Sequence, residues 1–334
     1  MSSLSDYYKE FPYLPIEILL FFSDFKTVND KLVVGTVMDC CESYAKKYRL
    51  QQIPQPGIVS AICDLLCLQG KLSLLHREGA DNVLSRYFAK AHPELKTNLA
   101  LQKYLNRSIG CLIYGFKYAY EVYKVYVKPI EYTDREGDIA LGSCFLYRGG
   151  IATAKHCIEG ASRIGIQGLT KEQLDSAKYL LHSNSAIDLV FIKLEIPLVD
   201  TAPYGDQAEI LDEVMAMGYP MVPGYHNFLT AETATVSARF TTSVGQIAAS
   251  AEDIWMREQL FLITARIRGG NSGGPIIKKN GNFAGISVNL AQGDGKYDDL
   301  GYGTVIPISL LDEIIDNEAK MELNINNITF KTFE

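Results

Sequence analysis

The chain has 334 residues, 47% of them hydrophobic, which is enough to bury one large core or two ordinary ones, so we expect two domains. Residues 1–130 carry 16 Lys and Arg against 12 Asp and Glu, and residues 131–334 carry 16 against 27; this mild positive excess at the start gives no reason to expect nucleic acid. No apolar run reaches the about 18 residues of a membrane span and no signal peptide is visible, so we expect a cytoplasmic protein without membrane contact.

Seven cysteines without an export signal favour free thiols in a reducing compartment over a disulfide framework. Cys63 and Cys67 are four residues apart and could share a helix face as metal ligands. No nearby Cys and His pair completes a four-ligand set, so buried small apolar side chains are the stronger interpretation. We expect no metal and no other cofactor.

The first 130 residues are predicted to be mainly helical. Apolar residues recur at three- and four-residue spacing in residues 15–25, 30–49 and 57–70, and the breaker "QQIPQPG" separates the last two. Residues 70–91 are compatible with a short hairpin that turns at "EGADN". Helix, helix and hairpin in this order fit a winged helix, a fold that contacts DNA or proteins, but general helical packing explains the same pattern.

Residues 109–127, "IGCLIYGFKYAYEVYKVYV", fit a helical stripe and also a strand. We predict a helix that links the domains, with its aromatic side chains as packing surface, and a domain boundary at residue 130. Residues 131–320 then show short apolar or alternating runs separated by Gly, Asn and Pro, which indicate an all-β barrel or sandwich. The runs are "IALGSCFLYR", "GIATAKH", "AIDLVFIKL", "EVMAMGYP", "TATVSARF", "LFLITARI", "GPIIKKNGNFAGISVNL" and "GYGTVIP".

Two local signals complete this part of the chain. "KNGN" at residues 279–282 predicts a hairpin turn, because Asn-Gly tolerates the positive φ angles of a tight turn. Beyond Pro307, "ISLLDEIIDNEAKM" predicts a closing amphipathic helix over residues 308–321. Residues 321–334 then form a C-terminal tail.

The stretch "RGGNSGGPII", residues 268–277, surrounds Ser272 with glycines. A serine hydroxyl is a poor nucleophile unless a base takes its proton and donors stabilise the oxyanion that forms. Backbone N–H groups of Gly270 and Ser272 could form that oxyanion hole. A glycine-rich turn with an incidental serine is the structural alternative, and the segment alone favours catalysis only modestly.

A base and an orienting carboxylate are available elsewhere in the chain. His156 follows the predicted strand "GIATAKH", and histidine is the side chain that acts as a base near neutral pH. Asp188 lies at the start of the apolar strand "AIDLVFIKL", where a buried carboxylate is costly unless it is paired. Each residue alone has a structural explanation: a structural histidine and a strand-capping aspartate.

The three residues occur in the order His156, Asp188, Ser272, each at a predicted strand end. "TAKHC", "AIDLVFIKL" and "GGNSGGPI" resemble the catalytic blocks of trypsin-like serine proteases with the chymotrypsin fold. "GSCFLYRGGIATAKHC", "VMAMGYP", "TARIRGGNSGGPII" and "GYGTVIPISLLDEII" resemble more narrowly the HtrA/Deg branch. The resemblance covers about residues 135–318.

The resemblance implies a serine endopeptidase that cleaves proteins or peptides through an acyl-enzyme intermediate. Ser272 would be the nucleophile, His156 the general base and Asp188 the group that orients it. The expected fold class is a mainly α-helical N-terminal domain, residues 1–130, followed by a two-β-barrel chymotrypsin-like protease domain with a C-terminal helix. The helical domain would regulate the protease or bind an activating partner, in stress response or defence by analogy.

Two departures from the family bear on regulation. In secreted trypsin-like zymogens a freed N-terminal ammonium pairs with an aspartate just before the serine, whereas this chain has the uncharged Asn271. Activation by N-terminal trimming is therefore not expected, and ordering of loops around the oxyanion hole is the favoured switch. Few residues follow position 318, so we expect no PDZ domain.

Residues that line the specificity pocket are implied by the same resemblance. Arg266, six residues before the serine, would favour an acidic residue before the scissile bond if its guanidinium is buried. Alternatively Arg266 points to solvent, and Ile267 and Val288 form a small aliphatic pocket. The strand "GISVN" also brings Ser287 to this pocket.

Two other classes of function remain open. A silenced protease fold that only binds would be marked by loss of His, Asp or Ser, and all three are present. A DNA-binding regulator would use the N-terminal domain, with proteolysis as its response.

Overall fold

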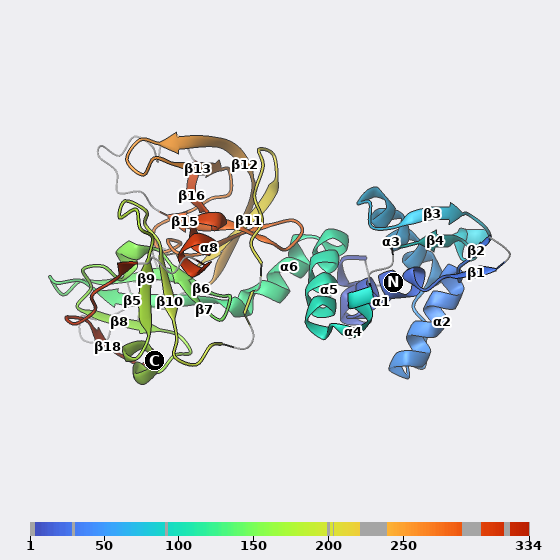
Figure 1. The fold of residues 1–334 in the computed structure, drawn as a ribbon, viewed down its shortest axis with the longest axis horizontal. Coiled ribbons are helices and arrows are strands. Elements are labelled where there is room, and N and C mark those ends of the chain that lie inside the picture. Colours follow the sequence, from blue (N-terminus) through green and yellow to red (C-terminus); the bar gives the residue numbers. More distant parts are fainter. Residues whose placement is uncertain are drawn as a thin grey trace. The chain divides into compact units, whose positions relative to one another are not determined.

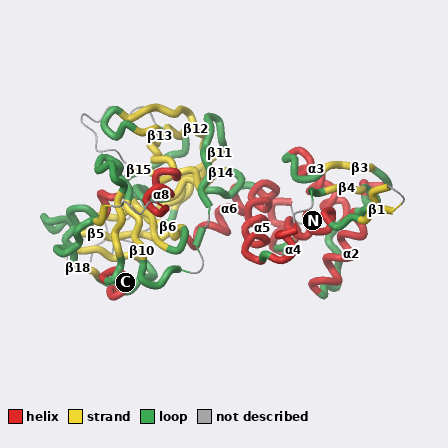
Figure 2. The backbone as a smooth tube through the Cα atoms, viewed as in Figure 1, coloured by secondary structure: helices red, strands yellow, loops and turns green. Residues whose placement is uncertain are grey.

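The computed structural model describes residues 4–28, 31–90, 93–198, 201–202, 204–220, 239–288, 302–316 and 321–333. The chain divides into two compact units, Met1–Val122 (unit 1) and Tyr123–Glu334 (unit 2). Helices dominate unit 1 and strands dominate unit 2 (Figures 1 and 2). Within the described ranges, no helix has both the length and the apolar character needed to cross a membrane.

Unit 1 is built mainly from helices whose ends are set by local sequence. The Thr36 hydroxyl accepts the N–H of Asp39, and the Asp39 carboxylate accepts the N–H of Thr36, a capping box that starts α2. Gly115, with φ +73°, ends α5. The elements are η1 Leu4–Lys9, α1 Leu14–Ser23, β1 Lys26–Val28, β2 Lys31–Val33, α2 Val37–Tyr48, α3 Pro56–Leu68, β3 Ser73–His76, η2 Ala80–Asn82, β4 Arg86–Phe88, α4 Pro93–Thr97, α5 Leu99–Tyr114 and α6 Phe116–Tyr123.

The structure confirms two sequence predictions for this unit and corrects a third. The hairpin predicted in residues 70–91 is confirmed, since β3 and β4 pair antiparallel. The helix predicted in residues 109–127 is confirmed as far as Tyr123, with a break at Gly115. The helix predicted over residues 30–49 is wrong at its start, because β2 pairs with β1 and the helix begins only after the Thr36 cap.

The first β structure of unit 2 is an eight-stranded sheet in the order β17-β9-β10-β7-β6-β5-β8-β18. At its centre β6 pairs antiparallel with β5 and β7, and β7 pairs with β10. All four residues of β7 are buried, in keeping with its central place. The elements here are η3 Lys124–Tyr126, β5 Val127–Thr133, β6 Ile139–Tyr147, β7 Gly150–Thr153, η4 Lys155–Cys157, β8 Arg163–Ile166, α7 Lys171–Asp175, β9 Lys178–Leu181, β10 Val190–Lys193, β17 Met321–Glu322 and β18 Thr329–Phe330.

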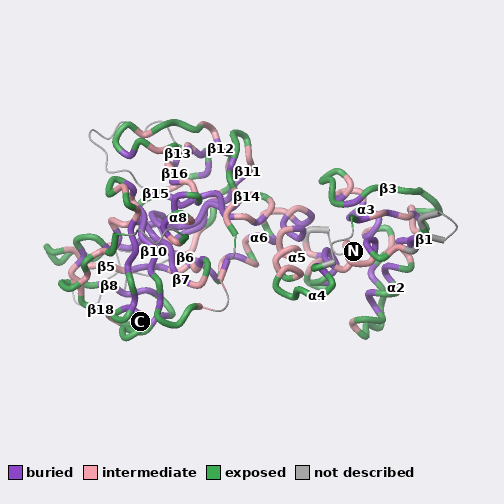
Figure 3. The backbone as a smooth tube through the Cα atoms, in the orientation of Figure 1, coloured by how far each residue is buried: buried purple, intermediate pink, exposed green. Residues whose placement is uncertain are grey.

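The second β structure of unit 2 is a closed barrel in the order β11-β12-β13-β16-β15-β14. Alternate residues of β11, Val214 and Ala216, pack in its core with Ile263 and Ile276. The strands are β11 Glu213–Gly218, β12 Thr241–Asp253, β13 Glu258–Ile263, β14 Pro275–Lys278, β15 Phe283–Val288 and β16 Gly303–Pro307. Every residue of β15 is buried, whereas β12 is mostly exposed or half-buried and is drawn largely green and pink in Figure 3.

Most strands predicted for this region are present. The turn predicted at residues 279–282 is confirmed: Gly281, at φ +83°, donates its N–H to the Lys278 carbonyl over 2.9 Å. Most of the predicted strand "TATVSARF" lies outside the described residues.

The C-terminal part differs from its prediction. The closing helix is confirmed as α8, Ile308–Asp316, but Met321 lies in β17 rather than in the helix. Residues 321–334 are not a separate tail, because β17 pairs with β9 and β18 pairs with β8. The buried Phe330 ring stacks on Tyr179 and anchors this segment.

The predicted boundary at residue 130 falls inside β5 rather than between the units. β5 pairs with β6 along its whole length and therefore belongs to unit 2, which begins at Tyr123. A helical N-terminal region followed by a β-barrel domain with a late helix is confirmed.

Candidate active site

His156 and Asp188 are brought together by two paired strands of the sheet. His156 lies in η4, directly after β7, and Asp188 lies just before β10, whose Val190 is paired with Thr153 of β7. The His156 Nδ1 atom is 2.6 Å from Asp188 Oδ2, and the His156 backbone N–H donates to Asp188 Oδ1 over 2.9 Å. Since a carboxylate accepts, Nδ1 carries a proton, and in the neutral ring Nε2 is left as an acceptor.

The environment of the pair permits base chemistry. The His156 side chain is 39% exposed and that of Asp188 is 17% exposed. Burial is the largest single effect and disfavours the imidazolium. The hydrogen bond that the ring donates to Asp188, a hydrogen bond with Cys157 and the charges of both groups together outweigh it, so the pKa of His156 lies above its ordinary value. A carboxylate in this place holds the tautomer of the ring and stabilises its protonated form.

The loop that carries Asp188 is fixed by side chains that the sequence analysis did not single out. Lys155 donates its ammonium to the Ser185 carbonyl over 2.6 Å. The Asn184 amide donates to the Met256 carbonyl over 2.7 Å, and its oxygen accepts the N–H of Ala186. The contacts of Lys155 with Ser185 and of Asn184 with Met256 join segments distant in sequence, so no local sequence pattern predicts them.

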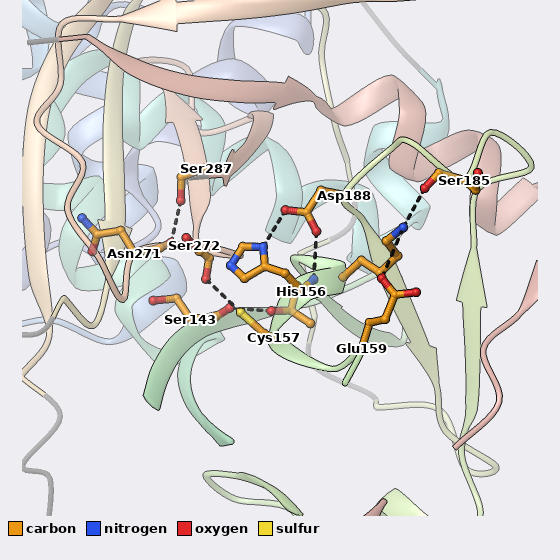
Figure 4. Close-up of polar contacts among 11 residues, drawn as sticks. Ser143, His156, Cys157, Glu159, Ser185, Asp188, Asn271, Ser272 and Ser287 are labelled. Atoms are coloured by element: carbon orange, nitrogen blue, oxygen red, sulfur yellow. Dashed lines mark hydrogen bonds and ion pairs between the residues drawn. The ribbon is translucent and has the colours of Figure 1, made fainter. Parts of the chain in front are cut away.

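Ser272 lies in the loop between β13 and β14 of the barrel. Its carbonyl accepts the N–H of Ser143 in β6 over 2.8 Å, which ties the barrel loop to the sheet. Gly273, at φ +84°, is required here because a Cβ atom would lie 2.1 Å from the Ser143 carbonyl oxygen. In the close-up the imidazole of His156 lies between Asp188 and Ser272 (Figure 4).

The turn before Ser272 presents backbone N–H groups. Asn271 donates its N–H to the Arg268 carbonyl over 2.9 Å, and Gly270 at the third position has φ +93°, which defines a type II turn. Among the described residues, the N–H groups of Gly270 and Ser272 donate to no backbone carbonyl. These are the two donors predicted for the oxyanion hole, and that role stays a prediction.

The predicted pocket residues occupy different environments. Arg266 is exposed, whereas Ile267 is half-buried and packs against the barrel core. Val288 is buried in β15. Ser287 is also buried, and its hydroxyl donates to the Asn271 carbonyl over 2.6 Å and to the Gly274 carbonyl over 3.1 Å. Because Arg266 is exposed, the alternative in which its guanidinium is buried in the pocket is wrong.

Candidate metal ligands are few in the described part of the chain. Oxygen atoms of Asp134, Glu136 and Asp138 lie within 4.8 Å of one another. Asp134 Oδ1, however, accepts the N–H groups of Glu136 and Asp138, so this carboxylate shapes the turn between β5 and β6. Cys63 is buried as predicted and Cys67 is half-buried.

Comparison with known proteins agrees with the motifs and this geometry. Residues 142–286 match the family model of the trypsin-like peptidase domain, so unit 2 contains a domain of this class. The resemblance to trypsin-like serine proteases and the predicted chymotrypsin-like fold class are confirmed.

The chain is also similar to HtrA/Deg proteases. It is 28% identical over 189 residues to a probable periplasmic serine endoprotease, DegP-like, of Chlamydia trachomatis, covering 54% of this chain and 34% of the relative. It is 28% identical over 169 residues to the serine endoprotease DegS of Haemophilus influenzae, covering 50% of this chain and 46% of the relative. The chain thus spans less than half the length of either relative.

A solved structure is also similar. It is the active form of the Rv3671c protease from M. tuberculosis, with a TM-score of 0.46 and 18% identity, covering 63% of this chain and 88% of that one.

Proposed function

We propose that the protein is a serine endopeptidase that cleaves protein or peptide substrates with Ser272, His156 and Asp188. The observation that carries the proposal is the 2.6 Å contact between His156 Nδ1 and Asp188 Oδ2, with the ring between Asp188 and Ser272 (Figure 4). The serine endoprotease names of the Deg relatives support the same reaction class.

The proposed reaction follows from these positions. His156 takes the Ser272 proton as the oxygen attacks the scissile carbonyl, and Asp188 stabilises the imidazolium. The N–H groups of Gly270 and Ser272 stabilise the oxyanion. The imidazolium then protonates the leaving amine, and the acyl-enzyme is cleaved when His156 activates a water molecule.

Covalent labelling with a fluorophosphonate tests this proposal. We expect the probe to modify Ser272 in the wild-type protein, because the Gly270 and Ser272 N–H groups donate to no backbone carbonyl among the described residues. Ser272→Ala should abolish labelling and lower peptide hydrolysis by about 10⁴-fold or more.

Ser162→Ala is a matched control, because this hydroxyl binds the carbonyls of Thr133 and Asp134, outside the site. It should label like the wild type. Labelling that persists in Ser272→Ala, or wild-type protein that neither labels nor hydrolyses peptides, would contradict the proposed function.

We further propose a preference for a small aliphatic residue before the scissile bond. The exposure of Arg266 and the burial of Val288 support an apolar lining. In a fluorogenic peptide panel with Asp, Glu, Val, Ala, Arg or Phe at that position, Val and Ala should be cleaved best, and Arg266→Ala should change their kcat/KM less than twofold. A preference for Asp or Glu that is lost in Arg266→Ala would reverse this assignment.

Unit 1 is proposed to bind an activating partner, in stress response or defence. Exposed Leu68, Leu74 and Leu75 support this, since they offer apolar surface to a protein. A change in the labelling rate of Ser272 when a partner is added tests this role. A cytoplasmic location stays a prediction from the free cysteines, whereas the DegP-like relative is named periplasmic.

A further inference from the structure

Ser143, in the middle of β6, is fully buried and uses every polar atom it has. Its backbone N–H donates to the Ser272 carbonyl over 2.8 Å, and its own carbonyl accepts the Thr153 hydroxyl over 2.7 Å. Its hydroxyl donates to the Gly270 carbonyl over 2.7 Å and accepts the N–H of Tyr219 over 2.8 Å. One residue of the sheet therefore holds both Gly270 and Ser272 of the barrel loop.

These contacts fall on Gly270 and Ser272, the two residues whose N–H groups are proposed to stabilise the oxyanion. The carbonyl and N–H groups of a residue belong to adjacent peptide planes, so holding the carbonyls of Gly270 and Ser272 restrains the orientation of both residues. The sequence of the turn supplies little restraint of its own, because Gly269 and Gly270 both tolerate a wide range of φ and ψ. The Ser143 hydroxyl supplies a restraint that the glycines lack.

The same residue also sets the hole relative to the base. β6 pairs with β7, with Cys144 opposite Thr153, and His156 follows β7 directly. The Thr153 hydroxyl reinforces this link through the Ser143 carbonyl. Ser143 thus connects the strand that leads to His156 with the turn that leads to Ser272 (Figure 4).

We propose that Ser143 is a positioning residue that holds the Gly270 and Ser272 N–H groups in register for the oxyanion; this inference rests on the proposed serine endopeptidase function. Removing the hydroxyl leaves the buried Gly270 carbonyl and Tyr219 N–H without their partner. Complete loss of an oxyanion donor lowers kcat by about 10²–10³-fold, so a loosened donor should cost about tenfold.

Ser143→Ala tests the proposal in the full-length protein. Kinetics would be measured with a peptide amide, and inhibition with a peptide trifluoromethyl ketone and with the product-like peptide acid of the same sequence. The ketone reports on the hole because Ser272 Oγ adds to its carbonyl carbon, the serine proton passes to His156, and the ketone oxygen becomes an oxyanion. We expect kcat to fall about tenfold and the ketone Ki to rise about tenfold, with less than twofold change in the Ki of the peptide acid.

A merely structural role would give a different pattern. Ser162→Ala, which also removes a hydroxyl bound to two carbonyls, should change neither kcat nor the ketone Ki. If Ser143→Ala does not fold, Ser143→Cys keeps a side chain of similar shape but a weaker donor, and the same selective loss of ketone affinity is expected. Equal losses in ketone and acid affinity, or an unchanged kcat, would overturn the role of Ser143. A wild-type protein that neither cleaves the amide nor forms the ketone adduct would instead refute the proposed function.

Discussion

The two units use their buried polar side chains differently. Among the described residues, those of unit 1 are Ser23, Thr36, Ser60, Ser85 and Asn106, and those of unit 2 are Ser143, Thr153, Asn271, Ser272 and Ser287. The two sets contain similar residue types in similar burial. What differs is the pattern of their partners.

In unit 1 Ser23, Thr36 and Ser85 serve the local chain, whereas Ser60 and Asn106 make contacts that are distant in sequence. The Ser23 hydroxyl donates to the Leu20 carbonyl within its own helix, and Thr36 caps α2. Ser85 accepts the N–H of Glu78 in the turn between β3 and β4. Among the described residues these five side chains share no hydrogen-bond partner with one another, so each contact could be removed without breaking the others.

In unit 2 the buried polar groups form a connected cluster around Ser272. Thr153 donates to Ser143, Ser143 donates to Gly270, and Ser287 donates to Asn271. Such a cluster inside an apolar protein fixes one arrangement of the chain to the extent that its members are satisfied. Among the described residues of the cluster, the Asn271 side-chain oxygen is the exception, since it is buried and has no hydrogen-bond partner. The comparison indicates that the two units differ in connection: the buried polar groups of unit 2 share partners around Ser272, whereas those of unit 1 act one by one.

The largest effect expected from this comparison is that of Asp188→Asn. Without the carboxylate, His156 loses its correct tautomer and the stabilisation of its charged form, so kcat/KM should fall by about 10⁴-fold. The base must be unprotonated, so activity rises with pH as His156 loses its proton. Because Asp188 raises the pKa of His156, the wild-type midpoint should lie above the ordinary value of about 6.5, and the variant's midpoint should be lower. A pH profile of kcat/KM for both proteins measures the shift.

Asp175→Asn is the control for this experiment. Asp175 is exposed at the end of α7, so neither the rate nor the midpoint should change. A midpoint that does not fall in Asp188→Asn would show that Asp188 does not act on His156 as the geometry indicates.

Much of unit 2 could be predicted from sequence because its signals are local. His156, Asp188 and Ser272 each stand in a short block whose composition is typical of one chemistry. The Asn-Gly turn before β15 and the break after Pro307 likewise act within a few residues. The structure places these segments where such patterns indicate.

The residues that escaped prediction act over long sequence distances. Ser143 lies in an apolar run that predicts a strand and nothing more, and its hydrogen-bond partner Gly270 is 127 residues away. β17 and β18 join the sheet through pairing with β9 and β8, which their own short sequences do not encode. The hairpin of β1 and β2 was missed because Leu32 and Val33 also continue the helical spacing of α2.

A smaller effect is expected in unit 1, from Asn106→Ala. The Asn106 side chain accepts the N–H of Ile16 over 3.3 Å and donates to the Pro12 carbonyl over 2.9 Å, so it ties α5 to the start of α1. Its loss leaves two polar groups unpaired and should lower the free energy of unfolding of unit 1 by about 1–3 kcal/mol, measured by denaturant titration of the helical circular dichroism signal. Gln52→Ala removes an exposed amide from the same unit and should change it by less than about 0.5 kcal/mol.

The same variant also tests the contrast between the units. Because Asn106 takes no part in the cluster around Ser272, the labelling rate of Ser272 should stay unchanged while the variant is folded. A slower rate under those conditions would show that the stability of unit 1 controls the oxyanion turn, and the contrast between separate and connected polar groups would then fail.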